Sequence, residues 1–197
     1  MGLRVTDEKT IHIVENVMTE FNKEIVDALE KKSCKAKSIT IKKNNIIYVD
    51  QEDKELGFVG RPKRVDVKLL KEIIKEDFVP VIIPMGLDEK GISYNINADT
   101  AAGAIARSIK SRRLMLLTDI DGVLDNNDKL ISEINTTEAK ELINTETIHG
   151  GMIPKVKTCI DAINNGVRAV VILDGRKPHS ILFELFSDKG SGTLIRK

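Results

Sequence analysis

Three short runs of apolar residues constrain the fold more than any other feature of this sequence. They occupy residues 79–83, 114–117 and 169–173. Fully apolar runs of this length are typical of strands that are buried on both faces of a parallel sheet. The segments between them carry apolar residues at every third or fourth position, a spacing that predicts amphipathic helices. The sequence therefore predicts an α/β fold, with helices on both faces of a mainly parallel sheet.

The remaining elements follow from the same patterns. A long helix is expected to start after Thr6, which would serve as its N-cap. Residues 38–50 contain two apolar segments around Asn44 and Asn45, which predicts a β-hairpin, and residues 56–59 are a candidate third strand. Further helices are expected over residues 67–74, 99–110, 136–144, 152–164 and 178–186, and a strand at the sheet edge over 193–195.

Composition excludes several classes of protein. The 31 Lys and Arg residues balance the 30 Asp and Glu residues, so the chain lacks the positive field that nucleic-acid binding needs. No apolar stretch approaches the roughly 18 residues of a membrane span. Cys34 and Cys159 lie far apart in the sequence and suggest neither a zinc site nor a disulfide framework. We expect a soluble, cytoplasmic protein of one domain or two closely packed lobes.

Polar loops follow all three apolar runs. Ligands of parallel α/β sheets bind beyond the carboxyl ends of the strands, so these loops are the first candidates for a site. Any one of them could also be an ordinary turn or helix cap. The candidate residues are Asn95, Asn97 and Asp99 after the first run, Thr118, Asp119, Asp121 and Gly122 after the second, and Asp174, Gly175 and Arg176 after the third.

Residues 149–155 form the most suggestive segment. Gly150 and Gly151 would let backbone N–H groups approach an anion, and Pro154 suits the first turn of a helix. The helix N-terminus and the Lys155 ammonium would both favour a phosphate group. The alternative is an ordinary glycine loop beside a solvated lysine. The sequence contains neither a P-loop nor a dinucleotide-binding fingerprint.

Five segments together resemble the acetylglutamate kinases of the amino acid kinase superfamily. Their order and spacing match the family, and further similarity over residues 174–193 extends the resemblance to essentially the whole chain. The segments are Gly2-Leu-Arg-Val-Thr-Asp7, Leu56-Gly-Phe-Val-Gly60, Tyr94-Asn-Ile-Asn-Ala-Asp-Thr100, Leu116-Leu-Thr-Asp119 and Gly150-Gly-Met-Ile-Pro-Lys-Val156.

The resemblance implies a three-layer sandwich and a phosphotransferase that uses ATP with Mg²⁺ to phosphorylate the side-chain carboxylate of N-acetyl-L-glutamate, in arginine biosynthesis. Residues 1–100 would be part of the acetylglutamate-binding lobe and residues 101–197 the ATP-binding lobe. The metal would be held mainly by phosphates. The implied catalytic residues are Lys155 and Asp99, the acceptor ligands Arg4 and Asn95, and the ATP-binding residues Thr118, Asp119, Gly122, Val123, Gly150, Gly151 and Asp174.

This set of residues suits the chemistry. Phosphoryl transfer needs mainly positioning and stabilisation of charge, which cations, backbone donors and an organising carboxylate can supply. An ionised carboxylate acceptor needs no general base.

The family also begins with a strand, a lysine and glycine-rich loops, and the sequence starts at a point that follows them. We therefore expect this chain alone to have little activity, and we expect a complementing N-terminal piece or a homo-oligomer as a partner. One alternative is an arginine-sensing subunit that uses His179, Glu184, Gly190 and Gly192. Another is a different kinase of the superfamily, for carbamate or UMP, against which residues 95–99 argue.

Overall fold

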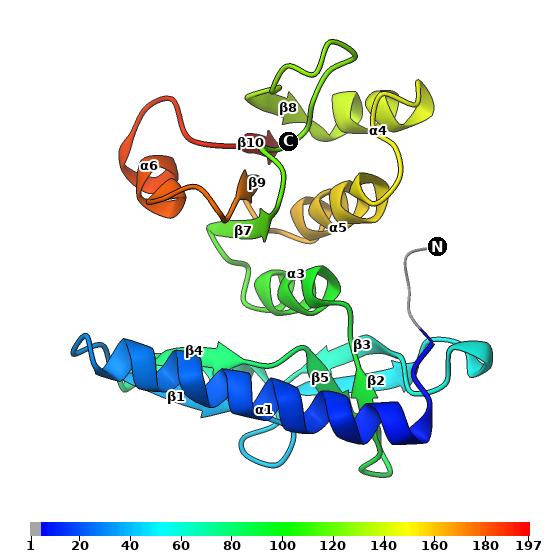
Figure 1. The fold of residues 1–197 in the computed structure, drawn as a ribbon, viewed down its shortest axis with the longest axis vertical. Helices are drawn as coiled ribbons and strands as arrows, with labels where there is room; N and C mark the ends of the chain where they lie inside the picture. Colours follow the sequence, from blue (N-terminus) through cyan, green and yellow to red (C-terminus); the bar gives the residue numbers. More distant parts are fainter. Residues whose placement is uncertain (1–4) are drawn as a thin grey trace. The chain divides into compact units, whose positions relative to one another are not determined.

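The computed structural model describes residues 5–197 and divides them into two compact units. The first unit extends to Ala104, and the second is Ile105–Lys197. Helix α3 (Ala98–Ser108) belongs to both, because the boundary falls within it (Figure 1).

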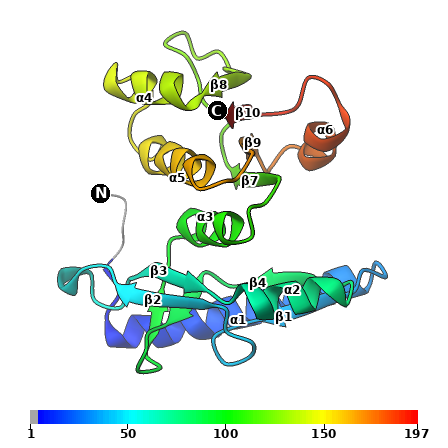
Figure 2. The same ribbon diagram turned by 180° about the vertical axis from the view of Figure 1, so that it is seen from behind.

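The first unit consists of small sheets and two further helices. Its strands form a parallel pair, β1-β4, and a four-stranded sheet of order β3-β2-β5-β6. Helices α1 and α2 lie on opposite faces of the β1-β4 pair (Figures 1 and 2). In chain order the elements are α1 (Glu8–Glu30), β1 (Ala36–Ile39), β2 (Ile47–Gln51), the 3₁₀ turn η1 (Lys54–Leu56), β3 (Gly60–Val65), α2 (Val67–Lys75), β4 (Val79–Ile82), β5 (Met85–Leu87) and β6 (Ser93–Asn95).

Helix α1 starts one residue later than the sequence predicts. Its N-cap is Asp7, whose carboxylate accepts a hydrogen bond from Thr10 N at 2.7 Å. Thr6 forms instead a parallel bridge with Gly57. The apolar face of α1 packs over a core cluster of Ile11, Ile41, Ile83 and Met85.

The hairpin predicted over residues 38–50 is wrong. Ile39 pairs in parallel with Ile82 of β4, whereas β2 pairs with β3 and β5 in the other sheet. Ile39, Ile46 and Ile47 are all at most 1% exposed, so this segment is buried on both faces. A two-stranded hairpin with one solvated face would leave such residues in water. The third strand expected over 56–59 is also wrong, because η1 precedes it and β3 begins at Gly60.

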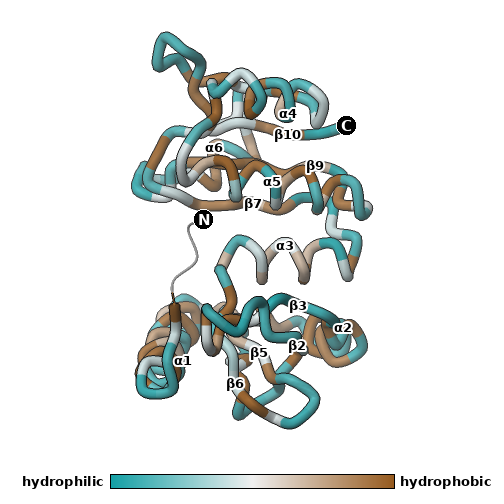
Figure 3. Tube along the Cα trace, turned by 90° about the vertical axis from the view of Figure 1, so that its right-hand side faces the viewer, coloured by the Kyte–Doolittle hydropathy of each residue, from teal (hydrophilic) through white to brown (hydrophobic). Residues whose placement is uncertain are grey.

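The second unit contains a four-stranded sheet of order β7-β9-β10-β8. Strands β7 and β9 are parallel, in register from Arg113↔Ala169 to Thr118↔Asp174, which confirms the prediction of parallel strands. β9 is buried as predicted, whereas β7 is buried only in part, since Leu117 is 48% exposed. Figure 3 shows the apolar stretches along β7 and α5. The elements are β7 (Arg113–Thr118), β8 (Glu133–Asn135), α4 (Thr136–Asn144), α5 (Met152–Asn164), β9 (Ala169–Asp174), α6 (Ser180–Phe186) and β10 (Thr193–Arg196).

The last strand does not lie at the sheet edge, as the sequence predicts. β10 lies between β9, to which it is antiparallel, and β8, to which it is parallel. Thr193 and Ile195 are fully buried there. The prediction failed because β8 has only three residues and too little periodicity to be recognised, so β10 had no apparent second neighbour.

The helices of the described chain include none that is both long enough and apolar enough to cross a membrane.

Candidate active site

A cleft of about 770 Å³ lies in the second unit, between the loop after β7 and the segment before α5. Two segments that are separate in sequence meet there, as expected at the carboxyl end of a parallel strand. The predicted residues that line it are Thr118, Asp119, Gly122, Val123, Gly150, Gly151 and Lys155.

One wall of the cleft is a short arm, residues 123–131. Leu124 and Leu130 pair in an antiparallel bridge, and the Asp125 carboxylate accepts hydrogen bonds from Asn127 N and Lys129 N. These backbone donors lower the pKa of Asp125. Asp125 therefore stabilises the turn at the tip of the arm.

Gly122, at the base of the arm, is required by packing. Its φ is +152°, and a Cβ there would lie 2.5 Å from Thr193 Oγ1 and 2.8 Å from Leu130. The Thr193 hydroxyl accepts a hydrogen bond from Val123 N at 2.8 Å and donates one to Ile131 O at 2.6 Å. The loop after β7 is thus fixed to the sheet by β10.

The opposite wall is the N-terminus of α5. Gly150 has φ +55°, and Gly151 is an N-cap that no side chain of the described residues caps. A Cβ on either glycine would meet none of the described atoms within 4 Å, apart from neighbours in the chain. Unlike Gly122, these glycines leave open space at the start of α5, and half-buried Lys155 lies one turn further along the helix. This arrangement suits an anionic ligand.

Asp174 has a structural role in an ion pair. It ends β9 in register with Thr118, and its carboxylate accepts three hydrogen bonds from Arg176, from N at 2.9 Å, Nε at 3.0 Å and Nη2 at 2.9 Å. The Arg176 hydrogen bonds lower the pKa of Asp174 to about 2. Within residues 5–197 the cleft is not lined by Asp174.

A second ion pair connects the loop after β9 to the loop after β7. Lys177 Nζ lies 2.8 Å from Asp121 Oδ1, so the loop after β9 holds the loop after β7.

In the first unit, the structure brings together three of the quoted segments. Asn95 N donates to Phe58 O at 2.9 Å, and Asn95 Nδ2 donates to Thr6 Oγ1 at 3.4 Å. Thr6 is bound in turn to Leu56 and Phe58 through its backbone. Arg4, the other expected acceptor ligand, lies outside the described residues. The surroundings of Asn95 are therefore built by residues 6, 56–60 and 94–95.

Asp99 lies in the first turn of α3 and is half-buried. The neighbouring Asn97 caps this turn, because its Oδ1 accepts from Thr100 N at 3.1 Å. Asn97 therefore has a structural role as the cap of α3.

Of the residues expected to bind arginine, Glu184 and Gly190 lie together, whereas Gly192 and His179 have other surroundings. Glu184 Oε2 accepts from Ser191 N at 3.0 Å, and a Cβ on Gly190 would lie 2.7 Å from that oxygen. A Cβ on Gly192 would lie 2.1 Å from Ile172 O, so packing alone requires this glycine. His179 precedes α6 with φ +60° and is exposed.

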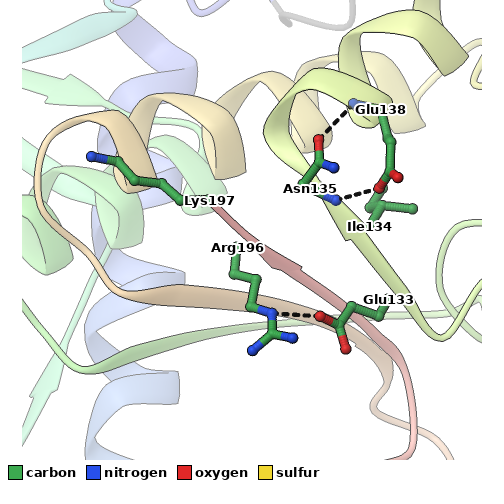
Figure 4. A pocket seen from close by; sticks show the side chains of 6 residues that line it. All are labelled: Glu133, Ile134, Asn135, Glu138, Arg196 and Lys197. Carbon is green, nitrogen blue, oxygen red and sulfur yellow. Dashed lines mark hydrogen bonds and ion pairs between the residues drawn. The ribbon is translucent and has the colours of Figure 1, made fainter.

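A smaller hollow of about 390 Å³ lies where β8, β10 and α4 meet. Its polar groups bind one another (Figure 4). Asn135 N donates to Glu138 Oε2 at 2.7 Å, Glu138 N donates to Asn135 Oδ1 at 2.9 Å, and Glu133 pairs with Arg196. These contacts cap α4 and join two strands.

Sequence reasoning missed two residues that shape the cleft. Thr193 contacts a loop 70 residues away, and no spacing indicates such a contact. Arg176 was identified only as part of a polar loop, although its position two residues after Asp174 allows the ion pair.

Comparison with known proteins places this fold and cleft in a class. The sequence model of the Amino acid kinase family matches residues 2–174. Carbamate kinase from Giardia lamblia shares the fold, with a TM-score of 0.67 at 17% identity over 96% of this chain and 73% of that one.

Other relatives are more similar in sequence. The acetylglutamate kinase of Pelagibacter ubique is 63% identical over 100% of this chain and 68% of its own length. N-acetylglutamate synthase from Neisseria gonorrhoeae, solved with coenzyme A and N-acetyl-glutamate, matches with a TM-score of 0.89 at 25% identity, over 100% of this chain and 46% of that one. The chain belongs to the amino acid kinase family and, within it, to the acetylglutamate kinases.

Proposed function

We propose that this protein transfers the γ-phosphoryl group of ATP to the side-chain carboxylate of N-acetyl-L-glutamate, a step of arginine biosynthesis in the cytoplasm. The observation on which the proposal rests is the α5 wall of the cleft, where Gly150 and Gly151 leave open space at the helix N-terminus and Lys155 lines the same cleft. The 63% identity to a curated acetylglutamate kinase supports the choice of acceptor over carbamate or UMP.

The nucleotide binds in the cleft of the second unit. Thr118, Asp119, Gly122 and Val123 form the wall for the adenosine part, and the N–H groups at Gly150 and Gly151 bind phosphate oxygens. Mg²⁺ would be held mainly by the phosphate oxygens of the nucleotide, where it would neutralise part of their charge, since it dehydrates reluctantly and commonly binds through substrate phosphates. The loop after β9 is joined to the end of β7, because Gly175 N donates to Thr118 O at 2.9 Å.

Lys155 stabilises the transferring group. During transfer, an oxygen of the acceptor carboxylate bonds to the γ-phosphorus while the bond to the β–γ bridging oxygen breaks, which gives an acyl phosphate and ADP. Charge on the phosphoryl oxygens is then concentrated beside the ammonium group and the α5 N-terminus. The acceptor is already an ionised carboxylate, so no base has to remove a proton.

The acceptor is bound by Asn95 with Arg4, and Asp99 organises the cationic groups. The contacts of Asn95 with Phe58 and Thr6 support this role, because they fix the amide against a framework of two backbone segments. A second copy of the chain and a complementing N-terminal polypeptide are further proposed partners.

Glu184 favours a second function, regulation by free L-arginine. Its side chain is only 7% exposed, and its Oε1 lies 3.5 Å from the Arg113 guanidinium. The carboxylate therefore already binds one guanidinium group within the chain, and such pairs are strong where they are desolvated. Free L-arginine carries the same guanidinium group, so Glu184 and the backbone of residues 190–192 would bind it through the same kind of charge-assisted hydrogen bond.

Thermal melts separate the two functions. MgATP or an unreactive analogue should stabilise the kinase, by about 2.7 kcal/mol at 100 times the Kd. With a complementing N-terminal polypeptide supplied, a trapping assay with hydroxylamine should then detect acyl phosphate that depends on N-acetylglutamate. A shift with arginine and none with nucleotide would favour the regulatory function and reject the kinase.

A further inference from the structure

The arm formed by residues 123–131 supplies much of one cleft wall, so its position decides the shape of the cleft. Ile131 N donates to Val123 O at 2.9 Å, which closes the base of the arm. From this arm the cleft is lined by Val123, Leu124, Asp125, Asn126 and Asp128.

A single hydroxyl group binds both sides of that base. Thr193 Oγ1 accepts from Val123 N at 2.8 Å and donates to Ile131 O at 2.6 Å. Thr193 is 0% exposed, and it comes from β10, which has a strand on either side. Its hydroxyl therefore joins the arm to an inner strand of the sheet.

We propose that Thr193 is a positioning residue for nucleotide binding: it holds the arm in the conformation that fits the nucleotide. This inference rests on the proposed function, because it assumes that the cleft binds ATP. Thr193 acts through Val123 and Ile131, since the lining of the cleft within residues 5–197 does not include it.

The physical reason is the effect of losing the hydroxyl. Replacement by valine keeps the shape of the side chain but leaves Val123 N–H and Ile131 C=O without their partner in a buried place. Movement of the arm toward water would restore hydrogen bonds to both groups. That movement would displace the wall and remove the preorganisation of the cleft.

The test is a titration of the full chain with a fluorescent ATP analogue and Mg²⁺. We expect Thr193→Val to weaken binding roughly ten-fold, the effect of losing one to two net hydrogen bonds. Thr193→Ser keeps the hydroxyl and should bind within about two-fold of the wild type.

Thr40→Val is the matched control. Thr40 is also buried, at 5% exposure, and its Oγ1 accepts from Lys43 N at 3.1 Å in a turn of the first unit. Its loss should leave nucleotide affinity within about two-fold of the wild type.

Two further readouts separate positioning from a general loss of stability. Hydrogen exchange at Val123 N should accelerate in Thr193→Val and stay slow in Thr40→Val. In turnover, the KM for ATP should rise while kcat and the KM for N-acetylglutamate change less.

Each result is decisive. Wild-type affinity in Thr193→Val would overturn the inference, as would an equal loss in Thr40→Val. If the valine variant does not fold, a serine variant with roughly ten-fold weaker binding would overturn it, and wild-type binding would support the hydroxyl. Failure of the wild type to bind nucleotide would instead reject the proposed function, and this inference with it.

Discussion

The two walls of the cleft both contain glycines, but for different reasons. A side chain at Gly122 would clash with Thr193 and Leu130. A Cβ on Gly150 or Gly151, by contrast, would meet no other part of the described chain within 4 Å, apart from adjacent residues. On the first wall, the Thr193 hydroxyl and the Asp125 carboxylate accept hydrogen bonds from backbone N–H groups of the arm. On the second, Gly150 and Gly151 leave open space at the start of α5, where a helix N-terminus can bind an anion.

This difference separates structural glycines from binding glycines. A substitution on the first wall should act mainly on stability, and one on the second mainly on binding.

The largest effect should follow from Lys155→Ala. In the presence of a complementing N-terminal polypeptide, loss of a cation where charge develops in the transition state should lower kcat by roughly 10²–10³-fold, with a smaller effect on acceptor binding. Lys157→Ala, on the same helix and exposed, is the control. Steady-state kinetics of both variants measure this, and an unchanged kcat in Lys155→Ala would remove the residue from the mechanism.

Gly122→Ala should destabilise the second unit by roughly 1–3 kcal/mol, because the new Cβ meets Thr193 in a backbone conformation that favours glycine. Denaturant unfolding measures the loss. A variant as stable as the wild type would show that the arm can move freely, against the packing account.

Asp174→Asn should change the pH dependence of stability. Because Arg176 lowers the pKa of Asp174 to about 2 from the usual 3.8, the carboxylate stabilises the folded state above pH 3.8. That contribution is lost as the pH falls from about 4 to about 2.

The variant should therefore be less stable at pH 7 and lose less stability than the wild type between pH 4 and pH 2. Unfolding curves across this range, with exposed Asp188→Asn as the control, test the prediction. Parallel curves for Asp174→Asn and the wild type would refute it.

Gly151→Ala should have the smallest effect on stability and a measurable one on binding. Its φ of −67° suits alanine and its surroundings are open, so the free energy of unfolding should change by no more than about 0.5 kcal/mol. The methyl group should instead obstruct phosphate and weaken nucleotide binding. An unchanged nucleotide affinity in Gly151→Ala would mean that the phosphate groups do not bind at the start of α5.

The sequence predicted the frame of the cleft well. Helices α4 and α5 match the expected ranges, because apolar periodicity defines both and the Asn135–Glu138 capping box marks the start of α4. The parallel-sheet rule placed Thr118 and Asp119 at the end of a buried strand, where the structure has them.

What failed depended on contacts between distant residues. The partner of β1 is β4 rather than its neighbour in sequence, and the place of β10 depends on the three-residue strand β8. Likewise, no local sequence pattern predicts the hydrogen bond between Thr193 and Val123. Such pairings depend on which faces can be buried together, and a single sequence does not encode that in its spacing.

The central claim is that phosphate groups bind at the start of α5. Backbone amide NMR of the chain, titrated with Mg²⁺ and an unreactive ATP analogue, tests it most directly. The amides of Gly150, Gly151 and Met152 should show the largest shifts, and Lys155→Ala should reduce them. Saturable binding that shifts amides elsewhere and leaves these three unchanged would contradict the account.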